Sequence, residues 1–180
     1  MIRLKSILTE ISLGQPYQTQ FVWRTEAWGK STQFDAPNTT IELLAVKGDI
    51  ESTGTNNAWN LGFSTKTAEG WTVNQRRYDP ATKQYAAYSV PAAEYMRILS
   101  TVAEAAFDFI AQQAPVTVTF EAYDSNPEKQ RQKNAIYMAL LRSASTRLKT
   151  MGYWWAVSQA GEVMISRKSR ADASGIDTRG

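Results

Sequence analysis

The stretch from Val116 to Lys168 decides the fold of this chain. It opens with Val-Thr-Val-Thr-Phe at 116–120, where β-branched and aromatic residues predict a β-strand. Asp-Ser-Asn-Pro-Glu at 124–128 is typical of a helix start, because a polar cap precedes a proline and an acid in the first turn. The long helix that follows is predicted to end just before Gly152, which supplies the stop.

A hairpin is predicted after this glycine. Tyr-Trp-Trp-Ala-Val at 153–157 and Val-Met-Ile at 163–165 are apolar runs, and Gln-Ala-Gly at 159–161 joins them as a turn. The whole stretch therefore predicts strand, long helix, strand, turn and strand. It contains no catalytic signature.

The residues from Gln18 to Tyr88 have the pattern of an antiparallel meander. Short runs of β-branched and aromatic residues alternate with loops rich in Gly, Asn, Thr and Asp. The predicted strands are 19–24, 31–36, 40–46 and 59–64, and 85–88 is the candidate for a closing strand. We expect Trp28, Trp59 and Trp71 to cover one face of the sheet, because large aromatic side chains are usually buried.

Two further helices are predicted. The longer one runs from Pro91 to Gln113, and a helix this apolar is buried against a sheet. Its apolar residues share one broad face, comprising Tyr95, Met96, Leu99, Val102, Ala103, Ala106, Phe107, Phe109 and Ile110. Residues 3–12 predict a short helix that either docks on the domain or packs on a partner.

The resulting order of helix, several strands, helix, strand, helix and two strands predicts a mixed α+β fold. In this fold an antiparallel meander is followed by helix, strand, helix and hairpin, and two long helices pack on a mixed sheet. A parallel strand pair around the helix that starts at Pro127 is compatible with this order. We expect an N-terminal helical arm at 1–14, a single domain at 15–166 and a polar tail at 167–180.

The residue types that the chain lacks exclude several classes of chemistry. Its 180 residues include no cysteine and no histidine, which excludes disulfides, thiolate nucleophiles and Ser-His or Cys-His pairs. No run approaches the roughly 20 apolar residues of a membrane span, so no membrane partner is expected. The carboxylate pairs Asp49–Glu51 and Glu121–Asp124 lack supporting ligands. We interpret them as exposed turn acids and predict no metal site.

The helix predicted at 127–150 is strongly basic. It carries six basic residues and one acidic residue, a net charge of +5 (six minus one). At about 100° per residue, Arg131, Arg142 and Lys149 fall on one line. The apolar line lies well away from it and runs through Tyr137, Leu140, Leu141, Ala144 and Leu148. Such a basic stripe is either a solvated helix face or a surface that binds nucleic acid or an acidic protein.

A second group of basic and aromatic residues occurs in the meander. Arg76 and Arg77 precede Tyr78, and Trp71 lies close in sequence. Arginine beside aromatic rings is a combination used to bind single-stranded nucleic acid. The alternative interpretation is a strand edge or a turn.

The residues from Phe120 to Tyr153 resemble a set of uncharacterised bacteriophage proteins with a fold like that of the GNAT acyltransferases. The resemblance lies within about 116–168. The matching residues are Thr119-Phe120, Asp124-Ser125-Asn126-Pro127, Arg131, Tyr137 and Gly152-Tyr153. The resemblance implies a bacteriophage origin, a virion or host-cytoplasm location and a GNAT-like mixed sheet.

The chain departs from the GNAT pattern where coenzyme A would bind. GNAT enzymes hold the coenzyme A pyrophosphate on the backbone amides of a glycine-rich loop. The corresponding residues here, 85–93, contain no glycine and no arginine, and Pro91 removes a backbone donor. Tyr137 corresponds to the position of the family's general acid, and the alternative is core packing beside Leu140.

These observations favour a non-enzymatic virion component or macromolecule-binding protein without a cofactor. The polar tail at 167–180 has one sizeable apolar side chain, Ile176, so it cannot order itself by burial, and we expect other protein subunits of an assembly to contact it. Nucleic acid is the other expected partner, through the helix at 127–150. The alternative is an active N-acyltransferase or nucleobase-modifying enzyme that uses acetyl-CoA, with Tyr137 or a carboxylate as its catalytic group.

Overall fold

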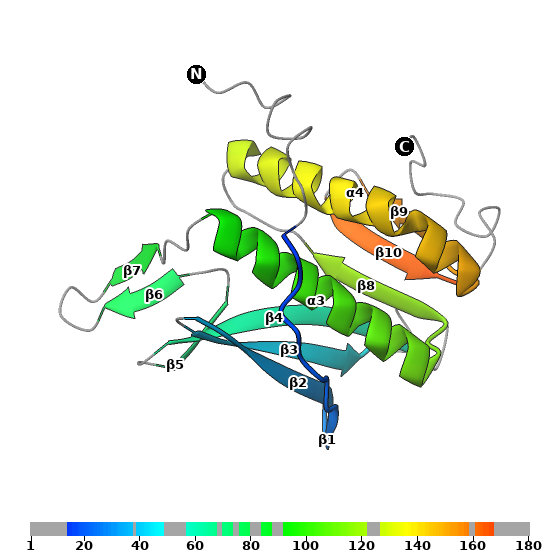
Figure 1. Cartoon of the computed structure of the whole chain (residues 1–180), viewed down its shortest axis with the longest axis horizontal. Helices are drawn as coiled ribbons and strands as arrows, with labels where there is room; N and C mark the ends of the chain where they lie inside the picture. The colour runs from blue at the N-terminus through cyan, green and yellow to red at the C-terminus, as the bar shows by residue number, and fades with distance from the viewer. Residues whose placement is uncertain are drawn as a thin grey trace. The chain divides into compact units, whose positions relative to one another are not determined.

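A computed structural model describes residues 14–37, 39–48, 57–67, 70–73, 76–79, 84–87, 92–121, 127–158 and 161–167 (Figure 1). The helix predicted at 3–12, the helix cap at 124–126 and the tail beyond Arg167 lie outside these residues.

The elements follow one another as β1 (Arg24–Glu26), β2 (Gly29–Ala36), β3 (Thr39–Lys47), β4 (Ala58–Thr67), β5 (Gly70–Val73), β6 (Arg76–Asp79), β7 (Gln84–Ala87), α3 (Ala92–Gln113), β8 (Thr117–Glu121), α4 (Pro127–Thr150), β9 (Trp154–Val157) and β10 (Glu162–Ser166). The strands of the larger sheet follow the order β1-β2-β3-β4-β8-β10-β9, and β5 pairs with β4. This mixed sheet with two long helices confirms the predicted α+β class.

The chain divides into two compact units. The α3 unit lies within Leu13–Val46 and Gly62–Phe109, and the α4 unit includes Lys47–Leu61 and Ile110–Gly180. Strand β4 and the end of helix α3 therefore belong partly to each unit.

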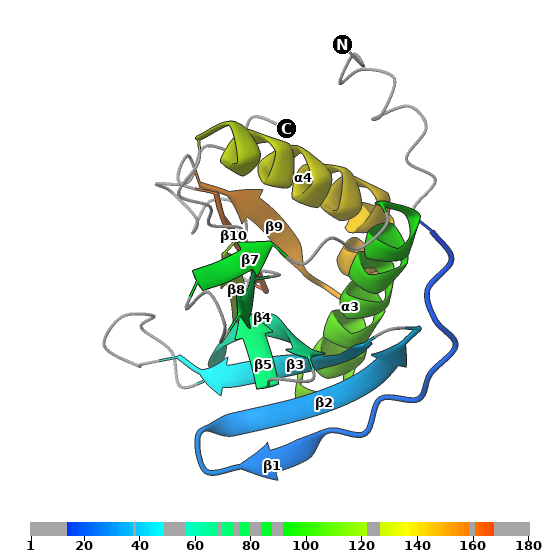
Figure 2. The ribbon, with the colours of Figure 1, turned by 90° about the vertical axis from the view of Figure 1, so that its left-hand side faces the viewer.

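An extended segment, residues 14–23, runs along helix α3 in the α3 unit (Figure 2). Its backbone N–H at Tyr17 donates to Thr101 Oγ1 at 2.9 Å. Its indole Nε1 at Trp23 donates to Asp108 Oδ2, also at 2.9 Å. We call this segment the strap. The sequence predicted a strand at 19–24, which is wrong for all but its last residue, because the strap bonds to helix side chains rather than to a neighbouring strand.

The apolar core of the α3 unit is formed by strands β2 and β3, helix α3 and the strap. Its buried members are Phe34, Ile41, Leu43, Ile98 and Ala105, and the strap adds Tyr17, Phe21 and Trp23. The Trp23 ring lies 4.9 Å from the ring of the fully buried Phe109. The predicted burial of helix α3 is therefore confirmed at Leu99, Phe107, Phe109 and Ile110.

Two predictions for the meander are wrong: the burial of Trp28 and the position of the last strand. Trp59 is buried as expected, but Trp28 is 45% exposed because it lies in the tight turn between β1 and β2. The candidate closing strand at 85–88 corresponds to β7. It does not close the meander, because β7 pairs with β6 in a separate two-stranded sheet.

Strand β10 lies between β8 and β9 in the α4 unit and is antiparallel to both. The hairpin predicted at 153–165 is confirmed by the pairing of β9 with β10. The strands flanking α4 are therefore not direct neighbours. The parallel pair in this sheet joins β4 to β8, from Ala58 opposite Thr117 to Asn60 opposite Thr119. Helix α3, rather than α4, lies between these two paired strands along the chain.

Helix α4 lies along β9 and β10, as Figures 1 and 2 both show. Leu141 and Leu148 are buried on its inner side, in agreement with the predicted apolar line. The helix ends as predicted at Gly152, whose φ is +81°. The N–H of Gly152 donates to the Lys149 carbonyl oxygen at 2.9 Å, and the N–H of Tyr153 donates to that of Leu148 at 2.9 Å. This pair of bonds is a Schellman ending, and it turns the chain directly into β9.

Candidate binding surface on helix α4

Positive charge in this protein is concentrated in helix α4. The helix carries a net charge of +5, whereas the whole chain carries +3. The residues outside α4 therefore sum to −2 (three minus five). Surface charge of one sign that collects on one element attracts partners of the opposite sign and raises their rate of association. Helix α4 is thus the element on which an anionic partner would be expected to bind.

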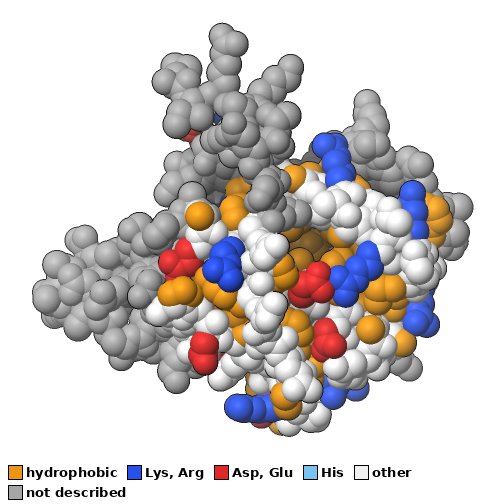
Figure 3. All heavy atoms as spheres, in the orientation of Figure 1, with side chains coloured by type: hydrophobic (Ala, Val, Ile, Leu, Met, Phe, Trp, Pro, Cys, Tyr) orange, Lys and Arg blue, Asp and Glu red, His pale blue; other side chains and the backbone are white. Residues whose placement is uncertain are grey.

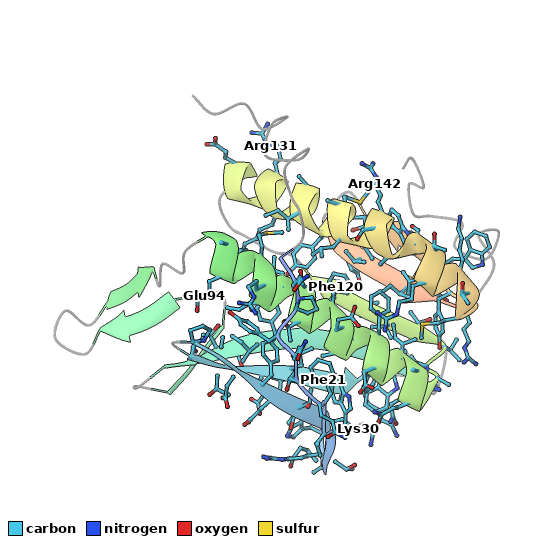
Figure 4. The ribbon with its side chains drawn as sticks, in the orientation of Figure 1. Phe21, Lys30, Glu94, Phe120, Arg131 and Arg142 are labelled. Carbon is cyan, nitrogen blue, oxygen red and sulfur yellow. The ribbon has the colours of Figure 1, made fainter. Side chains whose placement is uncertain are left out.

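The three residues of the predicted stripe are exposed. Arg131, Arg142 and Lys149 all lie on the solvent side of α4. Figure 4 shows that Arg131 and Arg142 both project from the side of the helix that faces away from β10. At 1.5 Å per residue, the stripe spans about 27 Å along the helix axis. In the face that Figure 3 shows, Lys and Arg side chains are spread over the surface, some of them beside Asp or Glu side chains.

Tyr137 lies on the opposite side of α4 from this stripe. Its side chain is partly buried, and its ring centroid is 5.4 Å from that of Phe120 on β8, with the rings tilted by 49°. Aromatic pairs at this separation contribute to packing beyond the area that they bury. The contact agrees with the packing interpretation of Tyr137, and its role as a general acid stays a prediction.

The C-terminal end of α4 adds an exposed aromatic ring to the basic residues. Trp154, the first residue of β9, is 48% exposed. Lys149 Nζ lies 5.9 Å from the centre of its ring, within the range of a cation–π interaction. Arg147, two residues before Lys149, is also exposed. Trp154 was not among the predicted site residues, although strict alternation along 153–157 places Trp154 and Trp155 on opposite faces of the strand.

Neighbouring side chains hold this end of the sheet in place. Trp155 Nε1 donates to Ser145 Oγ at 2.7 Å and so ties β9 to α4. The buried Tyr153 donates its hydroxyl to the Pro115 carbonyl oxygen at 2.7 Å, while Arg167 Nε donates to the same hydroxyl at 2.9 Å. Burial raises the pKa of the Tyr153 phenol, and the bond and charge of Arg167 oppose that rise.

Arg76 and Arg77 belong to the other unit. They lie on β6, paired with Ala87 and Ala86 of β7, so the strand interpretation is confirmed. Their side chains lie outside the described part of the structure. A role for them in binding stays a prediction.

The described residues offer neither a metal site nor a membrane-spanning helix. Within these residues, no group of three or more Asp or Glu side chains is placed to hold a metal ion. Neither α3 nor α4 is long and apolar enough to cross a membrane, and no other described helix is. Residues 88–91, in the region that would correspond to the coenzyme A loop, lie outside the described ranges.

Comparison of the chain with protein-family models, with curated proteins and with solved structures finds no match. The bacteriophage and acyltransferase resemblance therefore stays a prediction.

Proposed function

We propose that this protein binds an anionic macromolecule through the exposed side of helix α4 and has no enzymatic activity. The observation that carries the proposal is the charge distribution, because α4 holds +5 while all other residues together hold −2. The packing of α4 does not require these charges, because the residues of its apolar line fill its buried positions. The excess of positive charge on this helix would be offset by an anionic partner.

The resemblance at 116–168 suggests where such a protein would act. It favours a bacteriophage protein that acts in the virion or in the host cytoplasm, beside other protein subunits of an assembly. In such a setting, a basic helix would contact either a packaged nucleic acid or an acidic subunit.

Charge reversal on α4 tests the proposal. The variant R131E/R142E/K149E changes the net charge of the chain from +3 to −3, since each reversal removes two charges. The control variant R24E/K30E/K47E makes the same change on strands β1, β2 and β3. We expect the α4 variant to lose binding to an immobilised polyanion such as heparin at low salt, and the control to keep most of it.

The same variants separate binding from folding. Surface substitutions usually shift stability by about 0.5 kcal/mol or less each, so both variants should unfold near the wild-type urea midpoint. Equal polyanion binding by the two variants would contradict a specific role for α4. A saturable rise in melting temperature with acetyl-CoA would instead favour the acyltransferase alternative, because a ligand that binds only the native state stabilises it.

A further inference from the structure

Two tryptophans are prominent on the surface of the described residues, and they differ in their surroundings. Trp28 is 45% exposed in the β1–β2 turn, and Trp154 is 48% exposed at the start of β9. Trp154 adjoins the basic helix of its own unit, with Lys149 Nζ 5.9 Å from its ring centre. Trp28 belongs to the α3 unit, so the two residues match in type and exposure but lie in different units.

The backbone that carries Trp154 is anchored on both sides. Its strand is the last in the sheet order, and the residues on either side of it are anchored. Tyr153 is buried and bonded to Pro115, and Trp155 is bonded to Ser145 of α4. The Schellman ending at Gly152 constrains the three residues between α4 and β9. The ring of Trp154 is thus carried by an anchored backbone beside the basic stripe.

We propose that the anionic partner of α4 is single-stranded nucleic acid, and that Trp154 stacks on one of its bases. This inference rests on the function proposed above. Lys149 and Arg142 bind the phosphates of the same strand, because both are exposed on the side of α4 that carries the basic stripe. Stacking and phosphate contacts are available to every base, so we expect binding to be tolerant of sequence.

The aromatic ring decides between single strands and the other anionic partners. Proteins that bind single strands combine a basic track with aromatic rings on which bases stack, and every base has a face that stacks. In a duplex the bases already stack on one another, so a flat surface ring gains nothing from them. An acidic protein offers carboxylates to Lys149 and Arg142 but would also need an apolar patch for Trp154, whereas every single strand exposes base faces.

Binding of labelled oligonucleotides to the full chain tests this inference. The ligands are an oligothymidylate of about 16 nucleotides, within the range that one single-strand-binding domain covers, a duplex of equal length, and poly-L-glutamate. The variants are W154A, the matched control W28A, and the charge-reversed R131E/R142E/K149E. Fluorescence anisotropy gives the affinity, and circular dichroism confirms that each variant is folded.

We expect the wild-type chain to bind the oligothymidylate more tightly than the duplex or poly-L-glutamate. W154A should weaken single-strand binding about tenfold, the effect of losing one stacked base, and should leave duplex binding unchanged. W28A should bind like the wild type. In the conservative variant K149Q, the slope of log affinity against log salt should become shallower by about 0.7, the contribution of one phosphate contact on a single strand.

The outcomes distinguish this inference from the function on which it rests. If W154A binds the oligothymidylate like the wild type while the charge-reversed variant loses polyanion binding, α4 is a binding surface but the stacking inference is overturned. Tighter binding of poly-L-glutamate than of the oligothymidylate would overturn it in favour of an acidic protein partner. If neither W154A nor the charge-reversed variant changes any affinity, both proposals fail.

Discussion

Helices α3 and α4 have nearly equal lengths, 22 and 24 residues, but opposite surroundings. On α3, buried positions occur on several sides, and even Ser100 and Thr101 are buried. On α4, Leu141 and Leu148 are the buried residues within the described side chains, and its opposite side carries exposed arginines and lysines. The difference shows that α3 is covered by the strap as well as by the sheet of its own unit. Within the described residues, helix α4 is covered on one side, and its other side carries the exposed basic stripe.

Removing a core ring from α3 should produce the largest loss of stability. Phe109 is fully buried and packs against Trp23 of the strap. Phe109→Ala should lower the free energy of unfolding by about 3–5 kcal/mol, because the deletion loses apolar burial and leaves a cavity. Urea unfolding measures this loss. The corresponding truncation on α4, Arg142→Ala, should change stability by about 0.5 kcal/mol or less. A loss under about 1 kcal/mol for Phe109→Ala would contradict the burial of α3.

A substitution at the C-terminal end of α4 should cause the next largest loss of stability. Gly152 has a φ of +81°, in the left-handed region that an L-residue with a Cβ adopts at a cost of about 1–2 kcal/mol. Gly152→Ala should therefore destabilise the protein by that amount. Gly62 in β4 is the matched control, because a Cβ there also meets nothing within 4 Å and its φ is not in the positive range. Equal unfolding midpoints for the two variants would show that the left-handed turn does not fix the end of α4.

A smaller change in the free energy of unfolding is expected at alkaline pH, through the titration of Tyr153. Burial raises the pKa of Tyr153 above the ordinary tyrosine value of about 10, although Arg167 opposes the rise. The neutral phenol is therefore favoured in the folded state. Its contribution to stability is fully present below about pH 10 and is lost as the pH rises through the raised folded pKa. Tyr153→Phe should lower stability at neutral pH by removing two hydrogen bonds, and should make the alkaline decline less steep.

Urea midpoints at several pH values measure this decline for both proteins. The pKa values of Tyr17 and Tyr95 are also raised by burial, so the variant should keep part of the decline. An identical slope in wild type and Tyr153→Phe would contradict a raised pKa at Tyr153.

The sequence predicted both long helices and the hairpin well because their signals are local. Proline and acids mark the starts, Gly152 marks the end of α4, and the apolar period marks the buried side. The position of β10 between β8 and β9 was not predicted, because strand order depends on pairing between Val163 and Phe120, which lie 43 positions apart. The strap was not predicted either, because its alternating aromatic residues have the pattern of a strand. Its hydrogen bonds go instead to Thr101 and Asp108, and the local sequence does not show this.

The candidate site was predicted only in its charged part. The line of Arg131, Arg142 and Lys149 follows from helical spacing alone, so their exposure was foreseeable. The position of Trp154 was not, because two adjacent tryptophans in a strand face opposite sides and either one satisfies the local pattern. Ser145 decides which is held inward, through its bond to Trp155. That contact depends on how α4 packs on β9.

We propose that α4 binds a partner, whereas α3 packs in the core of its own unit. Hydrogen–deuterium exchange of the full chain, with and without saturating oligothymidylate, distinguishes the two helices. We expect slower exchange in peptides covering the C-terminal half of α4 and strand β9, with unchanged exchange across α3. Slower exchange confined to peptides from α3 or the strap, or no change in any peptide at a concentration where anisotropy shows binding, would contradict it.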